Sequence, residues 1–146
     1  MDDASAVDEN KITGPQPTQG RRPRRVAFVI DDSEDVHELF GEALESAGYR
    51  VVPAHNGRQA LDLLLDLPVP TVIVLDLIMP GINGFELLDV ISSYSRFATV
   101  PVLVVTASCD EIKLDVPFGK CLKKPVDGAL LVESVDALVD LKQSGT

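Results

Sequence analysis

The sequence has no tryptophan, and aromatic residues make up only 5% of its 146 positions. It has only two cysteines, Cys109 and Cys121, which form no CxxC motif and have no histidine pair nearby. This predicts neither a disulfide framework nor a zinc site, and we expect both cysteines to be small buried apolar residues. Basic residues are also few: 13 stand against 23 acidic ones, and the net charge is −10. That charge argues against a general affinity for nucleic acid or for an anionic membrane surface.

Long apolar runs are missing as well. The longest, Val69–Leu75, is interrupted by Pro70 and is too short to cross a bilayer. The first 25 residues contain no apolar segment of the kind found in secretory signals. Apolar residues nevertheless make up 45% of the chain, which is enough for a packed core. We therefore expect one soluble domain in the cytoplasm, without membrane contact.

Charge divides the chain into two unequal parts. Residues 1–25 carry a net charge of +1 and are rich in polar residues, proline and glycine, whereas the rest of the chain carries −11. We expect residues 1–25 to be a disordered tail, residues 26–142 to be the folded domain and residues 143–146 to be a short tail. The basic cluster Arg21–Arg25 is expected to be a solubilising arm rather than a binding site.

From Val26 onward, apolar strands alternate with amphipathic helices. Helices are expected over roughly residues 34–47, from Gly57 to a stop at Pro68, and over Phe85–Tyr94 and Val126–Leu141. The expected strands are Val26–Ile30, Arg50–Ala54, Thr71–Leu75, Val100–Val105 and Cys121–Lys123. This alternation predicts an α/β, doubly wound fold, in which helices cover both faces of a five-stranded parallel sheet. The segment Ser108–Lys120 shows little helical period, so helix four is expected to be shortened, irregular or missing.

Polar side chains follow four of the five expected strands. Asp31 and Asp32 follow the first, Asp76 the third, Thr106 the fourth and Lys124 the fifth. Each residue alone would ordinarily be a helix cap, a turn residue or a solvated side chain. In a doubly wound sheet, however, the carboxyl ends of the strands meet at one edge, where such folds bind their ligands. The set therefore predicts a functional site.

Three carboxylates at one edge repel one another and favour a bound cation. Because only oxygen ligands are available, a hard ion such as Mg²⁺ is favoured, and Mg²⁺ typically binds few carboxylates together with phosphate oxygens. A carboxylate in such a site can accept a phosphoryl group as a nucleophile. Thr106 and Lys124 would then meet the phosphate oxygens as a hydroxyl donor and a cation.

The segments Asp31-Asp32, Asp76–Gly84, Thr106-Ala107 and Lys124-Pro125 resemble the receiver domain of two-component response regulators, and the resemblance extends over about Val26–Leu141. It implies a flavodoxin-like strand order 2-1-3-4-5. The resemblance further implies that Asp76 is the phosphoacceptor and that Mg²⁺, or alternatively Mn²⁺, is bound by Asp31, Asp32, Asp76 and the backbone carbonyl of Ile78. It implies that Thr106 and Ala107 are phosphate-binding switch residues and that Lys124 pairs with the phosphate. It also implies a cis peptide bond before Pro125.

The chain departs from the family pattern at two places. On the last strand, the position that often carries a switching aromatic residue is Cys121, and Phe118 is the only aromatic residue nearby. The interval from Thr106 to Lys124 is also a few residues shorter than usual. Both departures fall where most receivers dock partners, so the output surface is expected to be unusual.

The resemblance implies a stand-alone receiver that accepts phosphate from a sensor histidine kinase or a histidine phosphotransfer protein and signals through an unidentified downstream protein. No DNA-binding or catalytic output domain fits after Leu141, so no direct nucleic-acid binding is expected. The sequence has no ATP-binding P-loop, so the phosphate must come from another protein or a small donor. At most, slow self-dephosphorylation is expected.

Three alternatives remain. A phosphohydrolase of the haloacid dehalogenase type also uses an Asp nucleophile, but it needs a second Asp at the position of Ile78. A flavodoxin-like flavin binder needs a hydroxyl- and glycine-rich loop where this chain has Asp31-Asp32. A receiver that signals without phosphorylation is the third alternative. The two histidines, His37 on the polar side of the first helix and His55 in a loop, are expected to be solvated surface residues.

Overall fold

The computed structural model describes residues 25–79, 81, 83–107, 109, 110, 112, 114, 116 and 118–144. The predicted N-terminal tail therefore lies outside the described residues, except for Arg25. That residue does not belong to a tail: it opens the first strand, and its guanidinium lies 6.0 Å from the ring centre of Tyr49.

Five parallel strands form one sheet. They are β2 (Arg25–Ile30), β3 (Tyr49–Ala54), β4 (Val72–Leu75), β5 (Val102–Thr106) and β6 (Gly119–Lys123). Their order across the sheet is β3-β2-β4-β5-β6, which in chain order is the predicted 2-1-3-4-5. β4 and β5 are fully buried because both faces of the sheet are covered, which is why they read as unbroken apolar runs.

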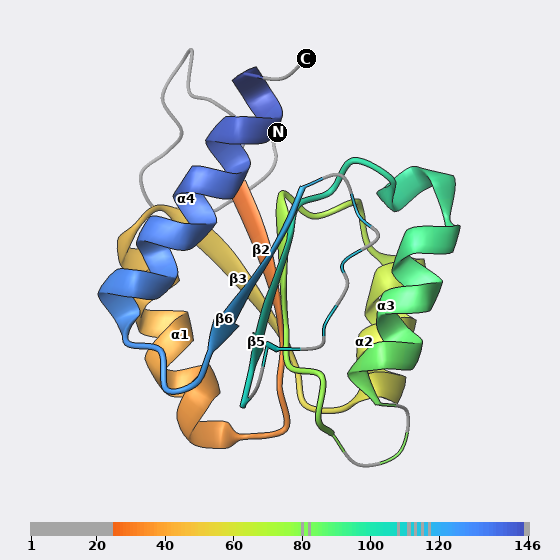
Figure 1. Ribbon diagram of the computed structural model, residues 1–146, viewed down its shortest axis with the longest axis horizontal. Coiled ribbons are helices and arrows are strands. Elements are labelled where there is room, and N and C mark those ends of the chain that lie inside the picture. Colours follow the sequence, from red (N-terminus) through yellow and green to blue (C-terminus); the bar gives the residue numbers. More distant parts are fainter. Residues whose placement is uncertain are drawn as a thin grey trace, which may run out of the picture.

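Helices cover the two faces in pairs, as Figure 1 shows. The helices α1 (Glu34–Ser46) and α4 (Gly128–Ser144) pack on one face, and α2 (Gly57–Asp66) and α3 (Gly84–Ser93) pack on the other. A short 3-10 turn, Ser95–Phe97, follows α3. Each face has its own apolar core, with Phe40 and Leu44 of α1 in one and Leu87 and Ile91 of α3 in the other. Among the described helices, none has the length and apolar character needed to span a bilayer.

The predicted helix starts follow from local hydrogen bonds. The side chains of Ser33, Asn56 and Asn83 each accept a hydrogen bond from a backbone N–H in the first turn of α1, α2 and α3, respectively. Gly48, with φ +97°, allows the left-handed turn after α1. At the other end of the chain, α4 continues to Ser144, beyond the predicted end at Leu141 and into the predicted C-terminal tail.

The described residues between β5 and β6 form no helix, as the sequence predicts. Ile112, Leu114 and Val116 instead pack their half-buried side chains against the core under α2 and α3. The segment also packs tightly on the start of β6, because a Cβ added to Gly119 would lie 2.6 Å from Val116 Cγ2 and 3.1 Å from Leu114 Cδ1. An irregular segment therefore occupies the place of a helix on this face.

The prediction for the cysteines was wrong. Cys109 and Cys121 form a disulfide, with Cα atoms 6.0 Å apart, and both residues are half-buried. Cys109 lies three residues beyond the end of β5, and Cys121 lies in β6, which pairs with β5, so the two residues come next to each other. Two cysteines without a motif carry no signal for such a contact in the sequence.

Candidate functional site

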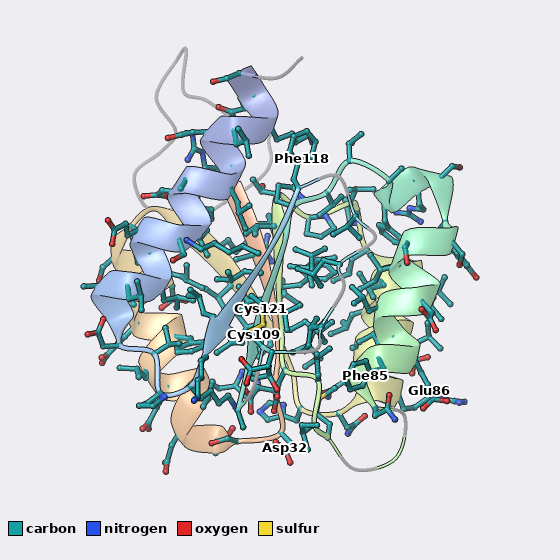
Figure 2. All side chains as sticks on the ribbon, viewed as in Figure 1. Asp32, Phe85, Glu86, Cys109, Phe118 and Cys121 are labelled. Atoms are coloured by element: carbon teal, nitrogen blue, oxygen red, sulfur yellow. A yellow bond between two sulfur atoms is a disulfide. The ribbon has the colours of Figure 1, made fainter. Side chains whose placement is uncertain are left out.

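Three carboxylates meet at the carboxyl ends of β2 and β4. Oxygen atoms of Asp31, Asp32 and Asp76 lie within 4.8 Å of one another. Asp31 is 2% exposed and Asp76 5% exposed, whereas Asp32 faces solvent. Parallel pairing aligns the strand ends, since the backbone N–H of Asp76 donates to the carbonyl of Ile30 at 2.9 Å. Figure 2 shows Asp32 at this end of the sheet.

Lys124 joins the two buried carboxylates. Its ammonium donates to Asp31 Oδ2 at 3.1 Å and to Asp76 Oδ2 at 3.4 Å. The strand β6 brings it there, because the backbone N–H of Lys124 donates to the carbonyl of Thr106 at 2.7 Å. Burial lowers the pKa of Lys124, but its hydrogen bond to Asp31 and the charges of Asp31 and Asp76 outweigh burial, so the pKa is raised above its usual 10.5. The Lys124–Pro125 peptide bond is cis, the isomer that the resemblance implies.

The pKa of Asp76 is raised above its ordinary value of 3.8, chiefly because burial disfavours the charged carboxylate. The nearby charge of Asp31 raises it further, whereas the hydrogen bond that Ile78 N donates to Asp76 Oδ1 at 3.2 Å and the ammonium of Lys124 lower it. Asp76 therefore carries its charge at an electrostatic cost, which a cation would relieve.

Asp31 is positioned by a residue that sequence reasoning placed wrongly. His37 is not a solvated surface residue: its Nε2 lies 2.7 Å from the carbonyl of Asp31 and 3.1 Å from the carbonyl of Ala54. Nε2–H therefore donates to the ends of both strands. The side chain of His55 is 41% exposed, in keeping with the prediction of a surface residue; its ring lies 4.2 Å from that of His37, and its Nε2 lies 2.8 Å from Glu34 Oε1. A histidine in the first helical turn after an Asp-Asp pair is the signal that could have suggested this.

The remaining predicted residues fall in three places. Thr106 ends β5, is 2% exposed and lies at the same edge of the sheet as Lys124, and the exposed Ala107 follows it. Cys121 lies in β6 opposite Val104. Phe118 lies at the other end of the sheet from Asp32, as Figure 2 shows, so it cannot act as an aromatic gate at this site. Ser108, which follows Ala107, lies outside the described residues.

The loop after Asp76 is held close to the site by a glycine. The N–H of Gly84 donates to the carbonyl of Leu77 at 2.9 Å, and a Cβ added to Gly84 would overlap Leu77 Cα and the carbonyl oxygen of Asp76. A side chain at this position would therefore displace the backbone of the loop that follows Asp76. Within that loop, Ile78 is 64% exposed.

The donor set fits a hard divalent cation. Carboxylate oxygens of Asp31, Asp32 and Asp76 are close enough to share one ion, and among the described ion pairs only the ammonium of Lys124 offsets part of their three negative charges. Oxygen-only ligands with one open, solvated side favour Mg²⁺ or Mn²⁺ over zinc. The exposed carboxylate of Asp32 provides this open side.

Comparison with known sequences gives a consistent family. Residues 27–136 match the response regulator receiver domain. The chain is 30% identical over 118 residues to the protein PilH of Pseudomonas aeruginosa, covering 77% of this chain and 95% of PilH. It is 32% identical over 116 residues to the transcriptional regulatory protein CpxR of Escherichia coli, covering 77% of this chain and 48% of CpxR. The chain thus spans nearly all of PilH but about half of CpxR.

Solved structures show the same arrangement. The chemotaxis response regulator CheY4 of Vibrio cholerae superposes with a TM-score of 0.72 at 26% identity, covering 80% of this chain and 99% of CheY4. A sensor protein from Polaromonas sp. JS666 superposes with a TM-score of 0.71 at 26% identity, covering 82% of this chain and 99% of that protein. The chain therefore belongs to the family of response regulator receiver domains.

Proposed function

We propose that this chain is a cytoplasmic receiver that accepts a phosphoryl group on Asp76 in a Mg²⁺-dependent reaction. Domains of this family are signalling phosphoacceptors of two-component systems rather than ordinary enzymes. The observation that carries the proposal is the position of Asp76: it is buried, lies within 4.8 Å of two further carboxylates and is 3.4 Å from the ammonium of Lys124.

In the proposed reaction, a carboxylate oxygen of Asp76 attacks the phosphorus of a phosphohistidine. The new P–O bond forms as the P–N bond breaks, and the imidazole leaves with the electron pair and takes a proton from water. Asp31, Asp32, Asp76 and the Ile78 carbonyl would hold Mg²⁺, which supplies charge neutralisation for the phosphoryl oxygens.

Lys124 would change partners in this reaction. Its ammonium now contacts Asp31 and Asp76, and a phosphoryl group on Asp76 would offer it a stronger acceptor. The hydroxyl of Thr106 and the backbone at Ala107 would bind the remaining phosphoryl oxygens. These side chains lie at one edge of the sheet on strands that are otherwise fixed by the core, so little rearrangement is needed to assemble the site.

We also propose that the phosphorylated chain removes its own phosphoryl group at most slowly. A phosphohydrolase of the haloacid dehalogenase type would need an acid at position 78, where this chain has Ile78, an apolar side chain that is 64% exposed. A flavin phosphate would meet Asp31 and Asp32 rather than a loop of hydroxyls and glycines. Neither alternative has a supporting observation at this site.

A groove of about 420 Å³ next to Lys124 suits a protein phosphodonor. It is lined by Val36, Leu39, Phe40, Lys124, Pro125 and Val126. Leu39 is 45% exposed, so an apolar surface lies beside the phosphate end of the site. We propose that a sensor histidine kinase or a histidine phosphotransfer protein docks here, and that the phosphorylated chain signals to a downstream protein without binding nucleic acid or membrane.

Intact mass after incubation with acetyl phosphate and Mg²⁺ tests the proposal. The wild-type chain should gain one phosphoryl group, and Asp76→Asn should gain none. Asp89→Asn, which alters an exposed acid on α3, serves as the matched control and should be labelled like the wild type. Labelling that persists in Asp76→Asn, or that is independent of a divalent ion, would show that Asp76 is not the acceptor.

A further inference from the structure

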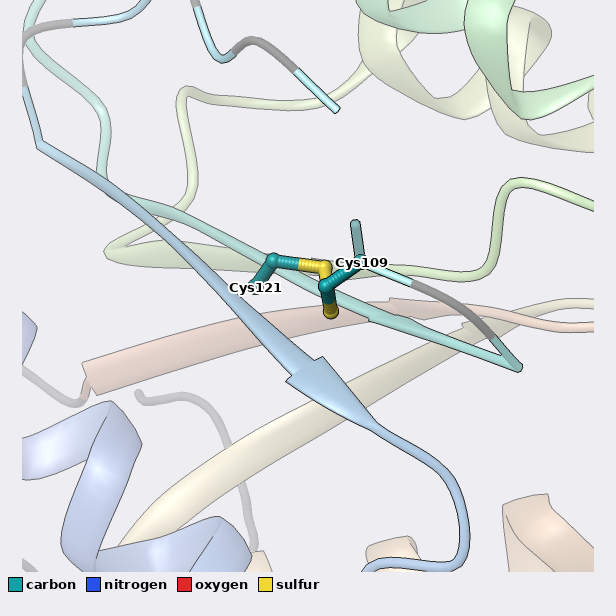
Figure 3. Close-up of a disulfide and its surroundings, with 2 residues drawn as sticks. All are labelled: Cys109 and Cys121. Atoms are coloured by element: carbon teal, nitrogen blue, oxygen red, sulfur yellow. A yellow bond between two sulfur atoms is a disulfide. The ribbon is translucent and has the colours of Figure 1, made fainter. Parts of the chain in front are cut away.

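The disulfide lies between two residues of the phosphoacceptor site. Cys109 is three residues after Thr106, and Cys121 is three residues before Lys124. The bond joins the segment that follows β5 to the edge strand β6, as Figure 3 shows. These are the only two cysteines of the chain. The single covalent cross-link therefore ties together the two chain segments that carry the proposed phosphate-binding hydroxyl and ammonium.

The bond is accessible to small reagents. Both cysteines are half-buried, and β6 is an edge strand in which every residue is exposed or half-buried. The described residues of the covering segment form no helix that would shield it. Thiolates attack exposed disulfides more readily than buried ones, and exposed disulfides are more often labile or regulatory.

The segment has contacts that do not depend on the disulfide. Ile112, Leu114 and Val116 pack against the core, and Gly119 allows the segment to lie close to β6. The N–H of Val102 donates to the carbonyl of Phe118 at 2.9 Å. The reduced chain therefore retains the apolar contacts that place β6 in the sheet, and breaking the cross-link does not require unfolding.

The cross-link acts on the same face of the sheet as Thr106. Cys121 pairs with Val104, and Thr106 is two residues further along β5, so all three side chains point to one face. The carbonyl of Thr106 also accepts the N–H of Lys124 at 2.7 Å. In the oxidised chain, the end of β5 is thus joined to β6 by the strand pairing and, three residues beyond Thr106, by a covalent bond. In the reduced chain it is fixed only by non-covalent contacts.

We infer that Cys109 and Cys121 form a reversible dithiol–disulfide site whose substrates are small thiols and disulfides, and that its oxidation weakens binding of a phosphoryl group at Asp76. The coupling rests on the proposed function of Asp76. Two equivalents of a thiol such as glutathione reduce the bond. One thiolate attacks a cysteine sulfur, which gives a mixed disulfide and one free cysteine. The second thiolate attacks the glutathione sulfur of the mixed disulfide, which releases the other cysteine as a thiol and forms glutathione disulfide. Oxidation is the reverse exchange with glutathione disulfide.

The sign of the coupling follows from the constraint. A phosphoryl group favours whichever arrangement of the Thr106 end of β5 gives its oxygens the best hydrogen bonds. The cross-link restricts the arrangements that this end can adopt, so the oxidised chain binds the group less favourably. The proposed cytoplasmic location fits this reading, because disulfides that form in that reducing compartment are mostly transient or redox-sensing.

The first experiment tests the redox site alone. The full chain is equilibrated with mixtures of reduced and oxidised glutathione, alkylated and weighed by intact mass, with circular dichroism recorded in parallel. We expect the chain to convert between an oxidised form, which takes up no alkyl group, and a reduced form, which takes up two. The far-ultraviolet circular dichroism of the two forms should be the same. A chain that remains oxidised in excess glutathione, or that unfolds when reduced, would show a purely structural disulfide and overturn the inference.

The second experiment tests the coupling. Binding of beryllofluoride with Mg²⁺ is measured by calorimetry for the oxidised and the reduced chain, with Cys109→Ser/Cys121→Ser as the control in both buffers. We expect about fivefold weaker binding to the oxidised chain, at the lower end of ordinary coupling between two sites, and no buffer effect in the control. Equal affinities in the two forms overturn the coupling. Absence of binding in every form overturns the proposed role of Asp76 and the coupling with it, while the glutathione result stands on its own.

Discussion

The ammonium of Lys124 lies 3.4 Å from the carboxylate of Asp76, the proposed acceptor, and 3.1 Å from that of Asp31. It is the only cation that the described residues bring within ion-pair distance of these two carboxylates. In the absence of a metal, this ammonium is the main compensation for the negative charge of the site. A divalent ion and Lys124 therefore act on the same carboxylates, and this has measurable consequences.

Lys124→Met should bind Mg²⁺ more tightly than the wild type, by about tenfold, which corresponds to 1.4 kcal/mol. The reason is that removal of the ammonium leaves the three carboxylates uncompensated, so the metal gains attraction and meets no like charge. Labelling by acetyl phosphate should nevertheless fall, since the phosphoryl group loses its cationic partner. Calorimetry and intact mass measure the two effects.

Lys123→Met is the matched control for this pair of measurements. Lys123 is the exposed neighbour on β6 and makes no contact with the carboxylates among the described ion pairs. If Lys124→Met weakened Mg²⁺ binding, or if both variants behaved alike, the ammonium would not compete with the metal.

Asp76→Asn should stabilise the metal-free chain at pH 7. Burial raises the pKa of Asp76 above 3.8 in the folded chain. Between pH 3.8 and this raised pKa, the folded chain therefore keeps a proton on Asp76 that the unfolded chain has released. The free energy of unfolding therefore falls as the pH rises from about 3.8 through the raised pKa, and the asparagine variant escapes this loss. Below pH 3.8, where both states are protonated, the advantage should vanish.

Thermal unfolding across this pH range measures the effect. Asp89→Asn, at an exposed position on α3, keeps Asp76 and serves as the control; its stability should follow the same course with pH as that of the wild type. In millimolar Mg²⁺ the order should reverse, because the wild type binds the ion more tightly and gains stability by mass action. A variant that is less stable than the wild type at pH 7 without metal would mean that the contacts of Asp76 outweigh the burial of its charge.

The sequence predicted most of the structural features that depend on the local pattern of apolar and polar residues. The parallel sheet, the helix positions and the meeting of Asp31, Asp32, Asp76 and Lys124 follow from alternating apolar segments and from the geometry of such a sheet, whereas the strand order came from the family resemblance. The pattern also indicated that the segment after Thr106 forms no regular helix. Each strand, each helix and each polar residue at a strand end can be identified from a few consecutive residues.

The features that were predicted wrongly depend on contacts between distant segments. His37 has the spacing of a polar helix position, and only the approach of Ala54 in β3 makes its Nε2–H bridge two strand ends. Cys109 and Cys121 meet because Cys109 follows the end of β5 and Cys121 lies on the neighbouring strand β6, and the sequence between them has no helical period that would indicate this contact. Long-range pairing of this kind is not encoded in local propensity.

Gly84→Ala should destabilise the chain by about 1–3 kcal/mol, the usual range for overpacking at a site that cannot relax easily. The added methyl group would overlap Leu77 Cα and the Asp76 carbonyl, both of which are backbone atoms. Because the displaced backbone carries Asp76, the proposed acceptor, phosphorylation should slow as well. Denaturant unfolding and the rate of labelling by acetyl phosphate measure the two changes.

Gly41→Ala is the matched control. Gly41 lies within α1, and a Cβ there would meet nothing within 4 Å, so alanine should raise stability by about 0.5–1 kcal/mol through helix propensity. Phosphorylation should stay unchanged. A Gly84→Ala chain as stable as the wild type would show that the loop after Asp76 can move aside without loss.

Leu39→Glu should separate the two kinds of phosphodonor. Leu39 is 45% exposed in the apolar groove beside Lys124, where we propose that a histidine phosphodonor protein docks. A carboxylate there would be desolvated on docking, so phosphotransfer from such a protein should slow by about tenfold or more. Labelling by acetyl phosphate, which needs no docking surface, should be unchanged. Leu65→Glu is the matched control, because Leu65 is also 45% exposed but lies on α2, on the opposite face of the sheet, and it should leave both reactions intact. If the two variants slowed protein phosphotransfer equally, the groove beside Lys124 would not be the docking surface, and the donor would have to approach Asp76 from another side.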